Sequence, residues 1–264
     1  MKFTDFKRAV SDLFSIDLNG YKEGQLKRRI EHLMLNQGYH SFDAYYLALS
    51  REKRQQEIFL DRFTINVSEF FRNQKAFETL EKNILSKLVS KKERLKIWSA
   101  ACANGAEPYS IAIILDELTP GKTHTIDATD IDRKILQEAK TGIYKSNQVK
   151  NVSPDRLKNY FTKNKDSWAI VPGIKKRVNF RYHDLLKDNY RHGYDIIICR
   201  NVVIYFTRET QERIYKNFFQ SLNPGGIIFI GVTESILNYR ELGFSSVYPW
   251  FYKKEANFFK EKVL

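Results

Sequence analysis

Two clusters of small and acidic residues near the middle of the chain have the types and spacing of a nucleoside-binding site. The turn Ala100-Ala-Cys-Ala-Asn-Gly105-Ala-Glu107 follows an apolar run, and its small residues let the backbone approach a ligand closely. The segment Ala128-Thr-Asp130-Ile-Asp132 follows the next apolar run, where an acidic residue commonly accepts hydrogen bonds from ribose hydroxyls. We assign that role to Asp130, because Asp132 has a simpler explanation as the N-cap of the following helix.

The same turn narrows the chemistry of the ligand. It holds one glycine and lacks the G-x-G-x-x-G pattern, so by itself it is also compatible with a tight structural connection. No lysine follows the glycine, which disfavours phosphate binding of the P-loop type. A cofactor with a nucleoside and no phosphates, S-adenosylmethionine, fits both features.

A third polar cluster, Arg200, Asn201 and Tyr205, follows the apolar run Tyr194–Cys199. Polar side chains at the end of a buried strand are unusual, and in this fold they would lie beside the cofactor cleft. Two alternatives stay open: Arg200 forms a structural ion pair, and Tyr205 is a packing aromatic.

The elements that position these residues alternate between strands and helices from Arg94 onward. Strands are expected at 94–101, 124–129, 178–182, 194–199 and 227–232, with helices at 107–118, 132–140 and 207–222 and a turn at Asn223–Gly226. This alternation predicts a parallel, doubly wound α/β sheet. A basic segment at about 142–177 interrupts it, with a short helix from Ser153-Pro154-Asp155 and a short strand at 168–171.

The first part of the chain reads as helical. Leu26, Ile30 and Leu33 form one apolar stripe, and Ser41 is the expected N-cap of a second helix. We therefore expect a helical N-terminal domain at 1–75, a linker helix at 76–93, and a cofactor-binding domain at 94–264 that carries the insertion.

Composition excludes several protein classes. No run of about 18 apolar residues occurs, and the first residues lack a hydrophobic signal core, so we expect a cytoplasmic protein without membrane insertion. Cys102 and Cys199 lie among apolar residues, as buried reduced thiols do, and no metal site is expected. The net charge is +13, and residues 141–187 hold eleven Lys/Arg against three Asp/Glu. This excess suggests an acidic protein surface, nucleic acid or anionic lipid as partner, or a solvated basic face.

Several motifs resemble one family in sequence order. Thr64-Ile-Asn-Val-Ser-Glu-Phe-Phe-Arg72 resembles T-x-N-x-T-x-F-F-R, and Trp98–Ala112 resembles W-S-A-G-C-S-x-G-E-E-P-Y-S-I-A. The further matches are Ala128–Asp132, His183-Asp-Leu-Leu186, Cys199–Phe206 and Asn223-Pro-Gly-Gly226. Over nearly the whole chain, the sequence is similar to the chemotaxis receptor glutamate methyltransferases (CheR), which implies a Rossmann-like class I methyltransferase sheet with a small all-helical N-terminal domain.

The resemblance implies a site residue by residue. The implied cofactor shell is Asn66, Ser68, Arg72, Glu107, Asp130, Asp184, Leu185, Arg200 and Asn201, with Tyr205 near the transferable methyl group. Ser68 replaces a threonine and keeps the hydroxyl. Ala101 keeps the turn small, although its Cβ restricts positive φ, and Ala106 leaves Glu107 as the only carboxylate there.

The resemblance also implies the reaction and the partner. The enzyme would transfer a methyl group from S-adenosylmethionine to glutamate carboxylates on the cytoplasmic domain of chemotaxis receptors, giving methyl esters and S-adenosylhomocysteine. Arg28 and Arg29 would contact the receptor from a helix outside the nucleoside pocket, and we expect a monomer that binds no nucleic acid. The alternatives are a nucleic-acid methyltransferase, which the basic segment motivates although the Asn/Asp-Pro-Pro-aromatic motif is missing, and a non-catalytic cofactor-binding module.

Overall fold

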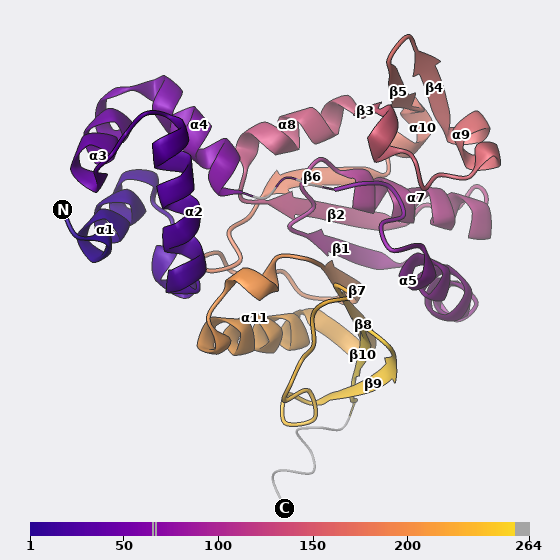
Figure 1. The fold of residues 1–264 in the computed structure, drawn as a ribbon. Coiled ribbons are helices and arrows are strands. Elements are labelled where there is room, and N and C mark those ends of the chain that lie inside the picture. The colour runs from indigo at the N-terminus through magenta and orange to yellow at the C-terminus, as the bar shows by residue number, and fades with distance from the viewer. Residues whose placement is uncertain (65, 67, 257–264) are drawn as a thin grey trace, which may run out of the picture.

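The computed structural model describes residues 1–64, 66 and 68–256, and the predicted domain's last residues, 257–264, lie outside this part. The chain begins with a cluster of helices that stands at one end of the molecule, beside the sheet (Figure 1). These elements are α1 (Phe3–Phe14), η1 (Leu18–Gly20), α2 (Glu23–Asn36), α3 (Phe42–Arg51) and α4 (Lys53–Phe63).

Two sequence predictions are confirmed in this helical part. The stripe of Leu26, Ile30 and Leu33 is buried and packs into one core with residues of α1, α3 and α4. Ser41 caps α3, because its hydroxyl accepts a hydrogen bond from the Ala44 backbone N–H at 3.2 Å.

A helical linker joins the first part to the sheet. It comprises α5 (Gln74–Thr79), a π-helical stretch η2 (Leu80–Leu85) and α6 (Ser86–Val89). Phe77, Leu80 and Leu85 are buried in the same core as the first strands of the sheet, so the linker is packed rather than a loose tether.

The main sheet has seven strands in the order β6-β2-β1-β7-β8-β10-β9. The bounds are β1 (Lys96–Ala100), β2 (Thr125–Asp130), β6 (Val178–Tyr182), β7 (Tyr194–Cys199), β8 (Leu222–Ile230), β9 (Phe244–Tyr248) and β10 (Phe251–Lys254). The helices α7 (Ala106–Leu118), α8 (Arg133–Thr141) and α11 (Arg208–Ser221) connect the strands. The strands at 178–182 and 194–199 agree with the sequence prediction, and Asp132 and Thr207 cap α8 and α11.

The sheet corrects the prediction in two places. It is mixed, because β10 runs antiparallel to both β8 and β9. In addition, Asn223–Gly226 belongs to β8 instead of forming a separate turn, and the pairing of β8 with β7 shifts register there. A register shift accommodates extra residues within a continuous strand. The Pro-Gly-Gly sequence at this place has the composition of a turn, so the sequence alone predicted one.

Helices cover both faces of this sheet, and the strands show why. In β7, Ile196 and Ile198 pack into the core that contains α7, whereas Ile197 and Cys199 pack into the core that contains α11. Successive side chains of a strand point to opposite faces, so an uninterrupted apolar run is what a strand buried on both sides requires.

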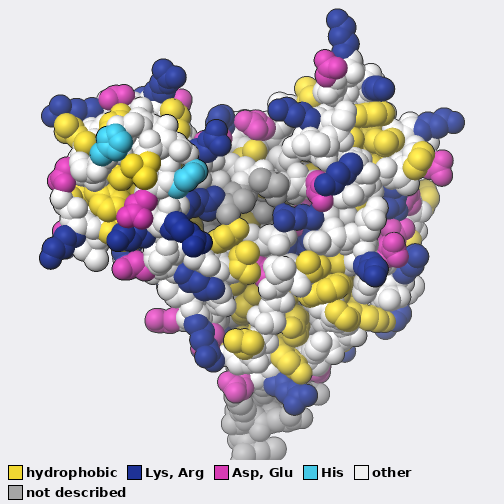
Figure 2. All heavy atoms as spheres, in the orientation of Figure 1, with side chains coloured by type: hydrophobic (Ala, Val, Ile, Leu, Met, Phe, Trp, Pro, Cys, Tyr) yellow, Lys and Arg dark blue, Asp and Glu magenta, His cyan; other side chains and the backbone are white. Residues whose placement is uncertain are grey.

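The predicted insertion forms a small subdomain at the upper right of Figure 1. It contains β3 (Ile143–Lys145), η3 (Ser146–Gln148), α9 (Pro154–Tyr160), β4 (Phe161–Asn164), β5 (Ser167–Ile170) and α10 (Pro172–Lys175). Its three strands form an antiparallel sheet in the order β3-β5-β4. Figure 2 shows that basic and acidic side chains are interspersed on the visible face and do not gather into one basic patch.

Three further findings concern the described residues. Cys102 and Cys199 are buried free thiols, as expected. None of the helices in this part of the chain combines the length and apolar character needed to cross a membrane. No cluster of three or more His, Cys, Asp or Glu within it is arranged to hold a metal ion.

Candidate active site

A cavity of about 230 Å³ lies where the carboxyl ends of β1, β2, β6 and β7 face the N-terminal helices. Every residue predicted for the cofactor shell lines it, as does Tyr205, so the structure brings together side chains from five separate sequence segments. The lining that was predicted consists of Asn66, Ser68, Arg72, Glu107, Asp130, Asp184, Leu185, Arg200, Asn201 and Tyr205.

The turn after β1 forms one wall in a strained backbone conformation. Ala101 and Ala103 adopt φ of 59° and 47°, and Gly105 adopts 82°. The left-handed region costs an alanine roughly 1–2 kcal/mol, so the two alanines store strain where the family pattern has a smaller residue at 101. Gly105 cannot be replaced easily, because an added Cβ would lie 2.9 Å from the Phe180 ring.

Asp130 holds this turn in place. Its Oδ2 accepts a hydrogen bond from the Ala103 N–H at 2.8 Å, and its Oδ1 accepts one from the Asp132 N–H at 3.0 Å. Burial raises the pKa of Asp130 to about 6, although these backbone hydrogen bonds oppose the shift. A carboxylate offers about four lone-pair sites, so acceptor capacity for a ribose remains.

Asp132 and Asn66 tie the interdomain segment to the sheet. Asp132 caps α8 through Oδ1, which accepts from the backbone N–H groups of Lys134 and Ile135. Its Oδ2 accepts from Asn66 Nδ2 at 2.7 Å and from Thr64 Oγ1 at 3.0 Å. The amide of Asn66 therefore has a structural partner at the edge of the cavity.

Arg200 and Glu107 form a buried ion pair at the base of the cavity. Arg200 Nη1 lies 3.3 Å from Glu107 Oε2, while Glu107 Oε1 accepts a hydrogen bond from Ser99 Oγ at 2.8 Å. The Arg200 guanidinium also donates to the Arg72 carbonyl and lies 4.6 Å from the centre of the Phe229 ring. Arg200 thus makes the structural ion pair that the sequence allowed, and this pair fixes the cavity floor.

Asn201 and Tyr205 belong to a short loop that Glu234 holds from behind. Asn201 has φ of 60°, and η4 (Val203–Tyr205) follows it. Glu234 Oε2 accepts from the Asn201 N–H at 3.1 Å and from the Gly231 N–H at 2.6 Å. Sequence reasoning missed Glu234, although a carboxylate just after the apolar strand β8 would reach the same sheet edge.

Two adjacent residues that line the cavity each have a buried polar atom without a partner among the described residues. Within the described chain, Asp184 Oδ2 and His183 Nε2 are buried without a hydrogen-bond partner. Burial raises the pKa of Asp184 and lowers that of His183 to about 4, so at neutral pH the imidazole is uncharged. An unpaired buried acceptor is costly unless a ligand donor reaches it, and the exocyclic amino group of an adenine is such a donor. These residues therefore fit a nucleoside-bearing cofactor.

The N-terminal helices complete the cavity with residues that sequence reasoning did not assign, among them Tyr21 and Phe63. Tyr21 packs edge-on against Phe206 at 4.8 Å, and their backbones form an isolated antiparallel bridge. The position of the Tyr21 side chain could not be inferred from sequence, because it depends on how the helical part docks on the loop after β7.

The structure separates the two arginines predicted to bind substrate. Arg29 lines the main cavity, contrary to the expectation that its helix lies outside the pocket, and its Nε donates to the Arg62 carbonyl at 3.2 Å. Arg28 lines only an adjoining groove. One helical turn carries both, but α2 docks with its Arg29 edge toward Tyr205, whose ring centre is 6.0 Å from the Arg29 guanidinium carbon.

Comparison with known proteins agrees with this geometry. Residues 1–64 match the family described as CheR methyltransferase, all-alpha domain, and residues 66–247 match CheR methyltransferase, SAM binding domain. A chemotaxis protein methyltransferase of Listeria innocua is 38% identical over 250 residues, which cover 94% of this chain and 95% of that protein. Chemotaxis protein methyltransferase 1 of Pseudomonas aeruginosa is 34% identical over 250 residues, with 89% and 90% of the two chains covered. The chain therefore belongs to the CheR family of S-adenosylmethionine-dependent methyltransferases.

Proposed function

We propose that this enzyme methylates glutamate side chains on the cytoplasmic domain of chemotaxis receptors, giving glutamate methyl esters and S-adenosylhomocysteine. Relatives along nearly the full length of the chain carry the name chemotaxis protein methyltransferase. The proposal places the enzyme in the cytoplasm, where that receptor domain lies, and treats it as a monomer.

One observation carries the choice of a carboxylate substrate: Arg29 is half-buried and has no acidic partner among the residues that the structure describes. None of the ion pairs among residues 1–64, 66 and 68–256 includes Arg29, and burial lowers the pKa of its guanidinium. Partial burial costs a cation without a counter-charge some of its hydration, and an incoming carboxylate would offset that cost. The location of this cation therefore favours an anionic substrate group.

The groove beside the cavity gives such a group a route to Tyr205. It is lined by Tyr21, Gln25, Leu26, Arg28, Arg29, His32, Phe63 and Tyr205. Four of these also line the cavity, namely Tyr21, Arg29, Phe63 and Tyr205. We infer that a receptor helix lies along the groove, with Arg28 near its surface and one glutamate side chain passing Arg29.

The proposed chemistry requires alignment more than proton transfer. When bound, S-adenosylmethionine supplies an electrophilic methyl group on a positively charged sulfonium. A glutamate has a pKa of about 4.3 and is ionised at neutral pH, so no residue has to act as a general base. Arg29 and Tyr205 would orient the carboxylate, and the packed walls of Phe63 and Phe206 would exclude water. Alignment of this kind contributes up to roughly 7–11 kcal/mol in ideal cases.

The decisive experiment uses methyl-labelled S-adenosylmethionine with a purified receptor cytoplasmic domain. We expect label on receptor peptides that contain glutamate, and we expect alkali to release it as methanol, because esters hydrolyse and N-methyl groups do not. Duplex DNA and structured RNA serve as alternative acceptors in parallel reactions. Label that resists base, or that appears on nucleic acid and not on receptor, would overturn the proposal.

A further inference from the structure

The segment Phe70–Asn73 connects the helical part with the linker and passes directly behind the cavity wall. Its backbone is unusual, since Phe71 and Asn73 adopt φ of 51° and 63°. Side chains with a Cβ disfavour this region, so surrounding contacts must hold the segment. The conformation matters because Arg72, between these two residues, lines the cofactor cavity.

The insertion subdomain grips the segment at Phe70. The Phe70 N–H donates to the Gln148 carbonyl at 2.9 Å, and its carbonyl accepts from Asn151 Nδ2 at 3.4 Å. The Phe70 ring packs edge-on against Tyr144 and Phe161, with ring centres 4.7 and 5.0 Å away. These partners all lie between residues 144 and 161, so the insertion contacts the cofactor-binding segment directly.

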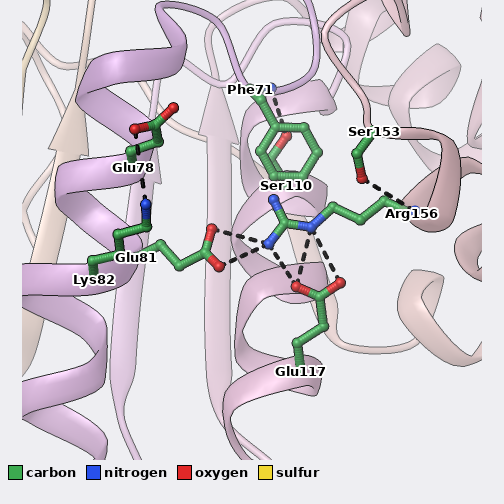
Figure 3. A network of polar contacts seen from close by, with 8 residues as sticks. All are labelled: Phe71, Glu78, Glu81, Lys82, Ser110, Glu117, Ser153 and Arg156. Carbon is green, nitrogen blue, oxygen red and sulfur yellow. Dashed lines mark hydrogen bonds and ion pairs between the residues drawn. The ribbon is translucent and has the colours of Figure 1, made fainter.

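Arg156 of α9 makes the neighbouring contact, shown in Figure 3. Its guanidinium carbon lies 4.7 Å from the centre of the Phe71 ring. Glu117 of α7 accepts from Arg156 Nε with both oxygens at 3.1 Å, and Glu81 of the linker accepts from Nη2 at 2.9 and 3.0 Å. Two carboxylates thus fix the orientation of the guanidinium, which lies over the Phe71 ring.

The opposite side of the segment is bonded to the methyltransferase core. The Phe71 N–H donates to Ser110 Oγ at 3.1 Å. Arg200 Nη2 donates to the Arg72 carbonyl at 3.0 Å and to Asn73 Oδ1 at 2.7 Å. The strained segment is therefore held from two sides, by the residues of the cavity lining and by the insertion.

We propose that Arg156 is a positioning residue for cofactor binding, which acts through Phe71 to hold Arg72 against the S-adenosylmethionine site. This inference rests on the proposed role of Arg72 in the cofactor shell. It gives the insertion subdomain a function in building the active site, separate from any contact that its outer surface makes with a receptor.

The test measures binding of S-adenosylhomocysteine to the full chain by calorimetry, with thermal unfolding of each variant measured alongside. Arg156→Ala is expected to weaken binding about five- to tenfold, or about 1–1.4 kcal/mol, which lies within the couplings measured between contacting residues. Arg156→Lys keeps the charge but loses the planar, bidentate geometry, so it should restore only part of the affinity. Lys163→Ala is the matched control: Lys163 lies over the Trp168 ring in the same insertion, and its loss should leave binding unchanged.

Phe71→Leu provides an independent variant, because it removes the ring while leaving the Arg156 pairs with Glu81 and Glu117 intact. We expect it to weaken binding to a similar degree. A double-mutant cycle then identifies the route. In an Arg72→Ala background, Arg156→Ala should cause no further loss of affinity, since the residue that it positions is already absent.

The outcomes separate this inference from the assignment of the cofactor site. If Arg72→Ala alone weakens binding but Arg156→Ala and Phe71→Leu do not, the site stands and the positioning role of Arg156 is refuted. If the losses from Arg72→Ala and Arg156→Ala are additive, Arg156 acts by another route and the inference is also refuted. Unchanged binding in Arg72→Ala would refute both the assignment of Arg72 and the inference.

Discussion

Asp130 gives the most direct test of the cofactor site, because its raised pKa makes binding depend on pH. Burial brings the pKa to about 6, so the carboxyl is mostly protonated at pH 5 and ionised at pH 7. Both oxygens already accept backbone hydrogen bonds, and protonation converts one remaining acceptor site into a donor. Hydrogen bonds to charged groups contribute about 1.5–3 kcal/mol. About a tenth of the protein is still ionised at pH 5 and binds with full affinity, so S-adenosylhomocysteine should bind roughly six- to tenfold more weakly at pH 5 than at pH 7.5.

The same pKa has a consequence of opposite sign for stability. The native-state value exceeds the unfolded value of 3.8, so the native state holds the extra proton between about pH 4 and 6. Ionisation of Asp130 consequently lowers the free energy of unfolding by about 3 kcal/mol as the pH rises through that window. The cofactor site thus gains affinity over the pH range in which the free enzyme loses stability.

Calorimetry with S-adenosylhomocysteine at several values between pH 5 and 8 measures the effect, and Asp130→Asn is the control. The asparagine amide has one acceptor oxygen and does not titrate. The variant should therefore bind S-adenosylhomocysteine weakly at all pH values, and its affinity should show no pH dependence with a midpoint near 6. A dependence that persists in Asp130→Asn belongs to Glu107 or Asp184, whose pKa values are also raised by burial. Equal affinity of the wild type at pH 5 and 7.5, in folded protein, would refute the ribose assignment.

Three further experiments test other parts of the site. Arg28→Ala should raise the apparent KM for receptor by less than about fivefold, and salt should mask the effect, whereas Arg29→Ala should lower methyl transfer at all salt concentrations because Arg29 is half-buried; equal behaviour of the two variants in steady-state assays would contradict the separation. Ala101→Gly should raise the free energy of unfolding by about 0.5–1 kcal/mol in a urea titration, since relief of positive-φ strain exceeds the added freedom of the unfolded chain. Glu234→Ala should lower kcat about tenfold or more, with Glu234→Gln intermediate, because the N–H of Asn201 loses its acceptor; an unchanged kcat would show that the loop holds itself.

Several elements could be predicted because their local signals agree with the fold. Residues 178–182 and 194–199 form uninterrupted strands, and Ser41 and Thr207 cap helices with their own side chains. A cap or a buried strand depends on a few adjacent residues, so sequence contains the information. The hairpin β9–β10 could not be predicted in the same way, since its place in the sheet depends on the pairing of β10 with β8.

The site residues also divide into a part that the sequence predicts and a part that depends on distant contacts. Its residues could be named from motifs at strand ends, but their partners could not. The contact of Arg156 with Glu81 joins residues 75 positions apart, and Glu234 reaches Asn201 across 33 positions. Interactions of this kind leave no local pattern, because either side chain alone looks like an ordinary surface charge. The placement of Arg29 inside the cavity was missed for the same reason.

The short backbone pairing between the helical part and the loop after β7 also limits how the chain can vary in length. The Lys22 N–H donates to the Tyr205 carbonyl at 2.9 Å, and the Thr207 N–H donates to the Gly20 carbonyl at 2.8 Å. Inserting one residue within Gly20–Lys22 would move the side chains that follow it to the other face of the pairing. A residue with a Cβ in place of Gly20 would meet Leu186 Cδ1 at 2.8 Å, so the Leu186 side chain would have to shift. This connection should therefore tolerate substitutions at exposed positions but neither insertions nor deletions.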